Sequence, residues 1–333
     1  MKYRELGQTR LRVSEIGFGC GNVGGLIIRG SNRERLEAVQ LALDLGINYF
    51  DTAPSYGNGR SETNLGKVLA ELEPKIILAS KVGLSLDQLD NIPSAVEESV
   101  EESLDRLQRD SIDILQLHSR IALTRESSKW SNSLSIKDVL NENGVADTFD
   151  SLRKKGKTRF IGFTGLGETS ALHKVVDSER FDLFQAYFNI LNPSAGYPVS
   201  REFSGHDFKQ LIDKANKKSM GVAAIRVMAA GALGGKASRK GYAAPVIRGP
   251  MVPGGEYEKD MDRVAKLGFI QKESRTLPQV ALQFVLSHHA VNTALVGFSN
   301  QNQIREAVES TNFGPISESQ MKELKELWSQ DNW

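Results

Sequence analysis

The chain has 333 residues, of which 40% are hydrophobic and 25% are charged. This length suits one large α/β barrel or two ordinary domains, and composition does not choose between them. The 42 lysines and arginines nearly balance the 41 aspartates and glutamates. No global field therefore draws the protein to nucleic acid or to an anionic membrane, and we expect a small-molecule partner. One sequence does not indicate the oligomeric state.

The opening MKYRELGQTRLRVS contains no apolar segment typical of a secretion signal, and no run approaches the roughly 20 apolar residues of a membrane span. The single cysteine, Cys20, excludes an internal disulfide and agrees with a reducing compartment. We therefore expect a cytoplasmic protein with no membrane partner. Cys20 ends an apolar run, so we interpret it as a buried strand-end thiol and not as a nucleophile.

Short apolar runs alternate with longer amphipathic segments along the whole chain. The predicted strands are residues 15–20, 48–51, 76–81, 112–118, 159–164, 183–188, 221–226 and 293–297. Segments with the spacing of amphipathic helices lie between the strands. One is 33–45, which Gly46 follows as a C-cap, and another is 94–107, where Ser94 follows Pro93 as a candidate N-cap. Eight such units closed on themselves predict a (β/α)₈ TIM barrel, one domain over residues 1–333.

A doubly wound open sheet is the alternative fold. It is less favoured because GNVGGLIIRG, and not a G-x-G-x-x-G turn, follows the first strand, and because no second domain boundary is visible. Residues 3–13 read as an N-terminal β-hairpin that closes the bottom of the barrel. The tail 317–333 reads as a helix capped by Ser317 with Gln320, lying across the barrel mouth or its flank.

Two connections are longer than usual: residues 119–138 after the fourth strand and residues 228–261 after the seventh. Both leave carboxyl ends of strands, where barrels place their chemistry, so we interpret them as walls of a substrate pocket. The aromatic candidates for lining that pocket are Trp130, Tyr187, Phe188, Tyr242 and Tyr257.

Four ionisable residues stand at or just after the ends of three consecutive predicted strands: Asp51, Tyr56, Lys81 and His118. A phenol with a free pKa of about 10 exchanges protons poorly at neutral pH, so we expect the Lys81 ammonium to lower the pKa of Tyr56. Asp51 would keep Lys81 charged, and His118 would bind the substrate oxygen. This set suits carbonyl–alcohol interconversion, with hydride exchanged by a nicotinamide.

The runs DTAPSYGNGRSETNLGKVL, ILASKVG, IDILQLH and IGFTG followed by FQAYFN resemble the aldo-keto reductase superfamily in order and spacing. The opening LGQTRLRVSEIGFGC and the closing LVGFSNQNQIREAV match its ends, so the resemblance covers essentially the whole chain. It implies that Asp51, Tyr56, Lys81 and His118 form the family's catalytic tetrad. It also implies a metal-free enzyme whose NADP or NAD lies extended across the barrel mouth.

The resemblance further implies contacts to the nicotinamide half of the cofactor. Thr164 and Gln185 match positions that hydrogen-bond the carboxamide, whereas Gly165 departs from the usual Asn. Ile225 stands where an aromatic ring often stacks on the nicotinamide, and Arg226 replaces the usual Ser. We count Arg226 among the candidate cofactor contacts.

For the adenosine half, Gly297, Ser299, Asn300 and Gln303 match the segment around the phosphate, at a helix start that favours an anion. Asn300 stands where many members place Arg for a 2′-phosphate, and Arg305 is a possible substitute. Family habit favours NADP, and these departures leave NAD open.

Two other functions stay open at this point. One is an NAD-dependent dehydrogenase that oxidises a sugar or a vitamin-like alcohol, as the QLHSRI run and Asn300 suggest; the other is a cofactor-sensing regulatory subunit with little turnover. We interpret Glu62 and Arg60 as packing and capping residues of a helix. His288 and His289 lack a third ligand at metal spacing, so no metal site is expected.

Overall fold

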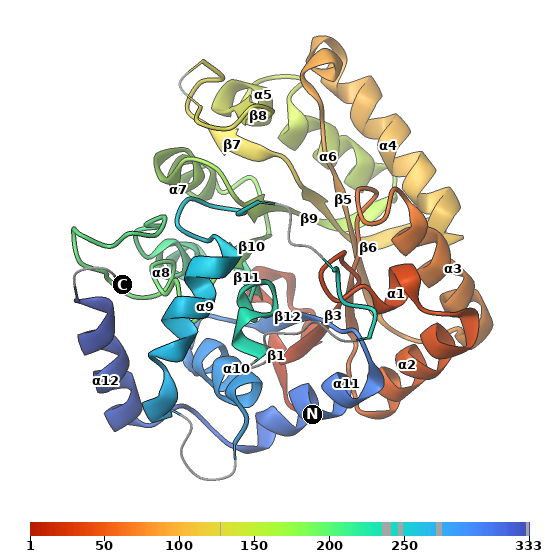
Figure 1. Ribbon diagram of the computed structural model, residues 1–333. Coiled ribbons are helices and arrows are strands. Elements are labelled where there is room, and N and C mark those ends of the chain that lie inside the picture. The colour runs from red at the N-terminus through yellow and green to blue at the C-terminus, as the bar shows by residue number, and fades with distance from the viewer. Residues whose placement is uncertain (127, 235–240, 246–248, 271–274, 331–332) are drawn as a thin grey trace.

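Eight parallel strands close into a barrel at the centre of the molecule (Figure 1). The structure is a computed structural model that describes residues 1–126, 128–234, 241–245, 249–270, 275–330 and 333. The barrel strands are β3 (Ile16–Gly19), β4 (Tyr49–Asp51), β5 (Ile77–Val82), β6 (Ile112–Leu117), β9 (Thr158–Gly165), β10 (Leu183–Tyr187), β11 (Gly221–Ile225) and β12 (Thr293–Gly297). They pair in this order and β12 closes on β3, which confirms the predicted (β/α)₈ barrel.

Helices connect successive barrel strands and form an outer ring around them (Figure 1). The ring contains α2 (Asn32–Asp44), α3 (Arg60–Leu72), α4 (Ile92–Leu107), α6 (Val145–Lys154), α7 (Thr169–Asp177), α8 (Leu211–Lys217), α10 (Leu277–Ser287) and α11 (Gln301–Glu309). Further elements are α1 (Leu26–Arg29), α5 (Ile136–Leu140), α9 (Tyr257–Ala265) and α12 (Glu318–Trp328), and the short strands β7 (Arg120–Ala122) and β8 (Ser133–Ser135). Because helices cover the sheet, each strand is buried on both faces and reads as an apolar run.

The start of α4 differs from the prediction. The helix begins at Ile92, and its N-cap is Asn91, whose side chain accepts a hydrogen bond from the Ser94 N–H. Pro93 lies within the first turn, where its missing N–H costs nothing. Ser94 is therefore inside the helix and is not its cap.

The N-terminal hairpin closes the bottom of the barrel. Strands β1 (Tyr3–Glu5) and β2 (Arg12–Ser14) pair in antiparallel fashion. The hairpin contributes three apolar side chains that pack against inward-facing barrel residues: Leu6, Leu11 and Val13 against Tyr49, Ile77, Ala79, Ile114, Leu183, Ala223 and Leu295. The predicted hairpin and its place are confirmed.

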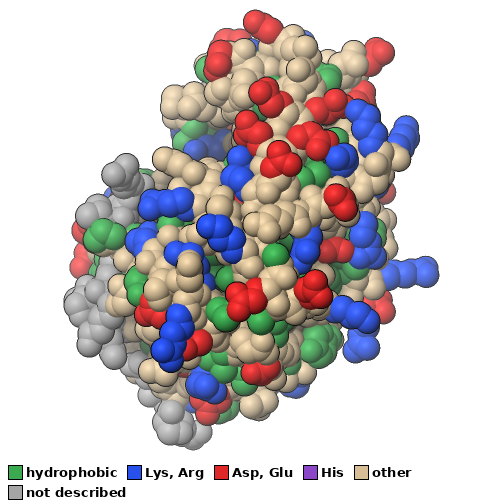
Figure 2. Space-filling model, turned by 90° about the vertical axis from the view of Figure 1, so that its right-hand side faces the viewer, with side chains coloured by type: hydrophobic (Ala, Val, Ile, Leu, Met, Phe, Trp, Pro, Cys, Tyr) green, Lys and Arg blue, Asp and Glu red, His purple; other side chains and the backbone are tan. Residues whose placement is uncertain are grey.

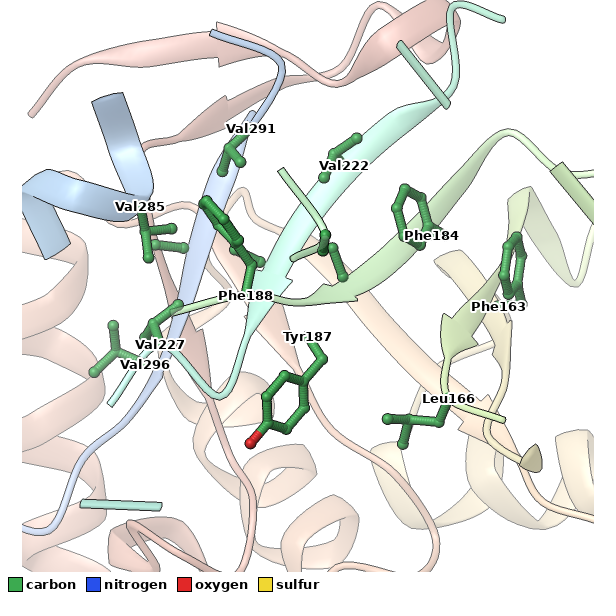
Figure 3. Close-up of a cluster of buried hydrophobic side chains, with 14 of the residues drawn as sticks. Phe163, Leu166, Phe184, Tyr187, Phe188, Val222, Val227, Val285, Val291 and Val296 are labelled. Atoms are coloured by element: carbon green, nitrogen blue, oxygen red, sulfur yellow. The ribbon is translucent and has the colours of Figure 1, made fainter. Parts of the chain in front are cut away.

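A second apolar layer fills the space between the barrel and the helices. Figure 3 shows part of it, where Phe163, Phe184 and Phe188 pack with valines of neighbouring strands and helices. The predicted tail helix, α12, has the Ser317–Gln320 capping box and lies at the periphery of the molecule (Figure 1). Its Trp328 indole donates a hydrogen bond to the Ile190 carbonyl. The tail helix therefore lies on the flank of the barrel, which is one of the two positions predicted for it.

The surface mixes charges of both signs. On the face shown in Figure 2, lysine and arginine side chains alternate with aspartates and glutamates over short distances. Many surface charges of the protein are paired, as in Lys155–Glu97 and Arg159–Asp113. Across the described residues, no helix has the length and apolar character needed to cross a membrane.

Replacing Leu6 with alanine tests the role of the hairpin. Leu6 is fully buried, so Leu6→Ala should lower the free energy of unfolding by about 2–5 kcal/mol through lost apolar contact and a cavity. Leu86, which is 47% exposed, is the control, and Leu86→Ala should change stability by less than about 0.5 kcal/mol. Urea unfolding curves measure both. Equal effects would show that the hairpin does not seal the barrel.

Candidate active site

A buried ion pair stands at the upper end of the barrel interior. Asp51 ends β4 and Lys81 lies within β5, and the lysine side chain is fully buried. Lys81 Nζ donates to Asp51 Oδ2 at 2.6 Å, to the Thr52 carbonyl at 2.8 Å and to the Tyr56 hydroxyl at 3.3 Å. All three ammonium protons therefore have an acceptor.

Tyr56 and His118 complete the group predicted from the sequence. Tyr56 lies in the turn after β4, and His118 follows the last residue of β6 directly. Their rings meet edge to face with centroids 5.6 Å apart, and the His118 Nδ1 is 3.4 Å from the Ser55 hydroxyl. The structure thus brings together all four predicted residues.

The ionisation of this group differs from the prediction in one respect. Burial raises the pKa of Tyr56, and the nearby Lys81 charge opposes this rise without overcoming it. Burial also disfavours the charged form of Lys81, but Asp51 and Tyr56 together raise its pKa above the usual value. Lys81 lowers the pKa of Tyr56, as predicted, but the desolvation of the phenol is larger, so the net shift is upward. At neutral pH the site holds a phenol and an ammonium.

His118 is neutral at physiological pH. Burial lowers its pKa to about 3, and the Lys81 and Arg120 charges add to the effect. A neutral imidazole keeps one donor and one acceptor nitrogen, so it can hydrogen-bond a carbonyl or a hydroxyl oxygen.

Two buried amides bind the other oxygen of Asp51. Gln185 of β10 donates to Oδ1 at 2.5 Å, and Gln116 of β6 donates to the same atom at 3.3 Å. Sequence reasoning did not single out Gln116, although it stands two residues before His118 and strand alternation puts both on the inner face. Gln185 was predicted as a cofactor contact, and in this structure its amide holds the carboxylate.

One cavity of about 930 Å³ opens above this group. Asp51, Tyr56 and His118 line it, while Lys81 lies behind them. The seven residues predicted to contact the cofactor all line the same cavity: Thr164, Gln185, Arg226, Gly297, Ser299, Asn300 and Gln303. The Thr164 hydroxyl is buried there without a hydrogen-bond partner. An orphaned hydroxyl at a cavity wall indicates a ligand that supplies the missing partner.

The far end of the cavity is formed by the start of α11 and by the loop after β3. Asn300 caps α11 by accepting from the Gln303 N–H at 3.1 Å, and the Gln303 side chain accepts from the Ser299 N–H at 2.8 Å. Gly24 lies so close to β12 that an added Cβ would be 2.4 Å from the Gly297 carbonyl carbon. At Gly24 and Gly297 the cavity wall is therefore backbone without side chains.

A sequence model of the aldo/keto reductase family matches residues 15–329. The chain belongs to the aldo/keto reductase family. L-galactose dehydrogenase from Arabidopsis thaliana is 30% identical over 315 residues, covering 92% of this chain and 87% of that protein.

Two solved structures share the fold over almost their whole length. An aldo-keto reductase from Bacillus halodurans in its holo form has a TM-score of 0.74 and 24% identity, covering 99% of this chain and 97% of its own. One from Klebsiella pneumoniae, in complex with NADP and acetate, has a TM-score of 0.69 and 18% identity, covering 98% and 96%.

This member departs from the family pattern at the ends of β9 and β11. Gly165 replaces the usual Asn, and a Cβ there would lie 2.9 Å from the Gln185 carbonyl and 3.0 Å from the Phe184 ring. The local packing therefore has no room for the longer side chain. Ile225 lines the cavity where the family often has an aromatic ring.

The two long loops of this reductase contribute unequally to the cavity. Among the described residues of 119–138, none lines it, so the prediction that this loop is a pocket wall was wrong. That segment instead forms the small β7–β8 sheet over α5 and α7. The second loop does line the cavity, with Met228, Met251 and Tyr257 among others, although its residues 235–240 and 246–248 lie outside the described residues.

The aromatic predictions have the same mixed outcome. Tyr257 lines the cavity. Phe188 is part of the core, Tyr187 is stacked on Phe208 and buried, and Trp130 packs edge-on against His206.

Tyr242 belongs to a segment, residues 241–244, that we call the strap. Its N–H donates to the Ser299 carbonyl at 3.2 Å, and its hydroxyl donates to Glu34 at 2.6 Å. The Arg29 guanidinium donates to its carbonyl at 2.8 Å. Ala244 N–H donates to the Val23 carbonyl at 2.9 Å. The strap therefore joins the loop after β3 to the end of β12.

The other residues considered from the sequence have structural roles. Cys20 is buried, and burial raises the pKa of its thiol. Glu62 is fully buried, where it accepts from Ser80 and pairs with Arg106 at 2.7 Å. Its role is a buried ion pair and not helix capping. Among described residues, no cluster of three or more histidine, cysteine or acidic side chains could hold a metal ion.

The neutral His118 in the cavity wall should make stability depend on pH. Its pKa is lowered from 6.5 to about 3, so below pH 6.5 the unfolded chain takes up a proton that the folded protein excludes, and stability falls with pH. Between pH 7 and pH 5 the loss at this residue is up to roughly 2 kcal/mol. His118→Gln should remove that share of the pH dependence in urea unfolding. Burial also lowers the pKa of His206 and His288, but both remain in the variant. An unchanged pH dependence would contradict a desolvated His118.

Proposed function

We propose that this chain is an NAD(P)(H)-dependent oxidoreductase that interconverts a carbonyl, aldehyde or ketone, and an alcohol by hydride transfer. The observation that carries the proposal is the hydrogen-bonded series from Asp51 through Lys81 to Tyr56, which ends beside His118 at the wall of a large cavity. Family membership supports the same reaction class.

Tyr56 is the proposed general acid and base. Because its pKa is raised, it carries a proton at neutral pH and can give it to a carbonyl oxygen during reduction. The Lys81 ammonium, 3.3 Å from the hydroxyl, stabilises the phenolate that remains. In the oxidative direction the proton of the alcohol passes to the phenolate form of Tyr56, which becomes more populated as pH rises and which Lys81 stabilises. Neutral His118 orients the substrate oxygen by a hydrogen bond.

The cavity fits a nicotinamide dinucleotide. The bound nicotinamide supplies or accepts the hydride. The orphaned Thr164 hydroxyl offers a partner to an amide, and the bare backbone at Gly24 and Gly297 allows close approach of an extended ligand. The residues proposed to hold the cofactor are Thr164, Gln185, Gly297, Ser299, Asn300 and Gln303. The seventh predicted contact, Arg226, lines the same cavity.

One observation favours the second candidate, an NAD-dependent dehydrogenase acting on a sugar or similar alcohol. The α11 end of the cavity is lined by Asn300, Gln303 and Glu306, and the Glu306 carboxylate, which accepts a hydrogen bond from Thr276, would repel a 2′-phosphate. Arg275 is a cation that also lines the cavity. Arg305, the possible substitute cation, is exposed and is not among the lining residues. The relative from Arabidopsis thaliana is named for the oxidation of a sugar.

Removing the Tyr56 hydroxyl tests the principal proposal. Tyr56→Phe should lower kcat by at least roughly 100-fold because the proton donor is lost, while cofactor affinity stays unchanged. Tyr49, two residues before Asp51, is the matched control because its buried hydroxyl has no hydrogen-bond partner, and Tyr49→Phe should retain activity. Steady-state kinetics with a generic aldehyde and NADPH or NADH measure this. If Tyr56→Phe keeps a tenth of the wild-type activity, Tyr56 is not the general acid. If the wild-type protein binds the cofactor but shows no turnover, the result favours the cofactor-sensing regulatory subunit.

The cofactor preference is tested at Glu306. Titration of the wild-type protein by fluorescence quenching at low, fixed ionic strength should show NADH binding at least as tightly as NADPH. Glu306→Gln removes the carboxylate, so it should tighten NADPH binding by roughly 2- to 5-fold and leave NADH binding unchanged. A strong wild-type preference for NADPH that Glu306→Gln does not alter would contradict this assignment and favour the reductive role.

A further inference from the structure

The cavity wall carries a guanidinium that has no acidic partner. Arg226 follows the last residue of β11 and lines the cavity, and its Nε is buried without a hydrogen-bond partner. No carboxylate of the described residues forms an ion pair with it. An uncompensated charge in a partly desolvated position is costly, and a ligand of opposite sign removes that cost.

The backbone around Arg226 is arranged to hold this side chain in place. Its φ of 57° lies in the left-handed region, which a long side chain rarely adopts. The buried Asn189 fixes it by donating from Nδ2 to the Arg226 carbonyl at 3.0 Å, and the Ala229 N–H donates to the same oxygen at 2.8 Å. Asn189 is in turn held through its Oδ1 by two backbone N–H groups. A strained conformation that is held this firmly indicates a functional position.

The acids near Arg226 already have cations of their own. Asp260 of α9 lies close enough for the Arg226 charge to lower its pKa, but it accepts a hydrogen bond from Arg263 at 3.0 Å. Glu256 is 3.5 Å from Lys259. Another neighbour is the Tyr187 hydroxyl, whose pKa is raised by burial and which is therefore neutral. In Figure 3, Tyr187 lies near the carboxyl end of β10, apart from the phenylalanines packed along the strands.

A second arginine contacts the cavity wall from behind. Arg120, two residues after His118, donates to the carbonyl of Met251, a residue of the cavity wall. Its Nε is also buried without a partner, burial lowers its pKa, and its charge contributes to the lowered pKa of His118. It likewise has no ion pair within the described part of the chain. Arg226 thus lines the cavity and Arg120 lies behind its wall, and neither forms an ion pair with an acid of the described residues.

We propose that this cavity selects carbonyl or alcohol substrates that carry a carboxylate, with Arg226 as the residue that pairs with the anion and Arg120 as a supporting charge. A planar guanidinium binds a carboxylate through two parallel hydrogen bonds, which fixes the substrate's orientation as well as its charge. The inference rests on the proposed function, because it names the substrate class of the same site. The pyrophosphate of the cofactor is the competing anion, and the sequence resemblance assigned Arg226 to the cofactor.

Two aldehydes of the same shape separate the effect of substrate charge from the effect of substrate shape: 4-carboxybenzaldehyde and 4-formylbenzamide. The wild-type protein should prefer the acid in kcat/KM. Arg226→Met should lower kcat/KM for the acid by roughly 10- to 100-fold and change the amide little. Arg226→Lys should restore part of the preference. Arg275 also lines the cavity but is engaged by Gln283 and the Phe313 ring, so Arg275→Met, the control, should leave the acid-to-amide ratio unchanged.

A binding measurement makes the test independent of turnover. Calorimetry on cofactor-saturated protein should show 4-hydroxymethylbenzoate binding more tightly than 4-hydroxymethylbenzamide, with the difference lost in Arg226→Met. Equal wild-type affinities for the two compounds overturn the inference. So does an Arg226→Met variant that keeps the acid preference while its Kd for NADH and NADPH rises, because Arg226 then serves the cofactor. Failure of the proposed function has a different signature, namely cofactor binding without turnover of either aldehyde.

Discussion

The site depends on one buried ion pair. An ammonium in the interior of a barrel loses its hydration, and without compensation it would be neutral or the chain would not fold. Asp51 supplies the compensation at 2.6 Å, and two glutamine amides in turn hold the second carboxylate oxygen. The charge of Lys81 is thus fixed by residues from three other strands, β4, β6 and β10. The position of the Tyr56 hydroxyl follows from this arrangement because it is one of only three acceptors for the lysine.

The barrel explains why residues distant in sequence meet at this pair. Parallel strands direct their carboxyl ends to one face of the barrel. Residues at or next to the carboxyl ends of β4, β5 and β6 therefore lie close together. The closed bottom and the covering helices supply the apolar burial that keeps the pair dry. Stability and site geometry are therefore connected: the same packing that fixes the strands raises the pKa of Tyr56 and lowers that of His118.

The sequence was informative where periodicity and chain order decide the outcome. The eight strands, the hairpin and the convergence of Asp51, Tyr56, Lys81 and His118 follow from apolar runs and from the residues at their ends. Gln116 could also have been found, because strand alternation puts it on the same face as His118. Gln116 is less conspicuous than its charged neighbours in the site because an amide within an apolar run carries no charge.

Other features depend on competing contacts in the folded protein, which a single sequence does not reveal. The sign of the Tyr56 shift results from burial competing with Lys81, and only the extent of burial decides it. The loop at 119–138 leaves the correct face of the barrel but folds over α5 and α7 and away from the cavity. The left-handed backbone at Arg226 is set by Asn189, which stands 37 residues earlier. Each of these outcomes rests on contacts between segments far apart in the chain.

The sealed bottom of the barrel has a kinetic consequence. Since Leu6, Leu11 and Val13 fill the amino-terminal end, molecules that meet at Tyr56 enter and leave by one opening. Both reactants therefore share the opening at the carboxyl side of the barrel. A change in the loop after β11, which lines that opening, can alter the entry and release of cofactor and substrate together.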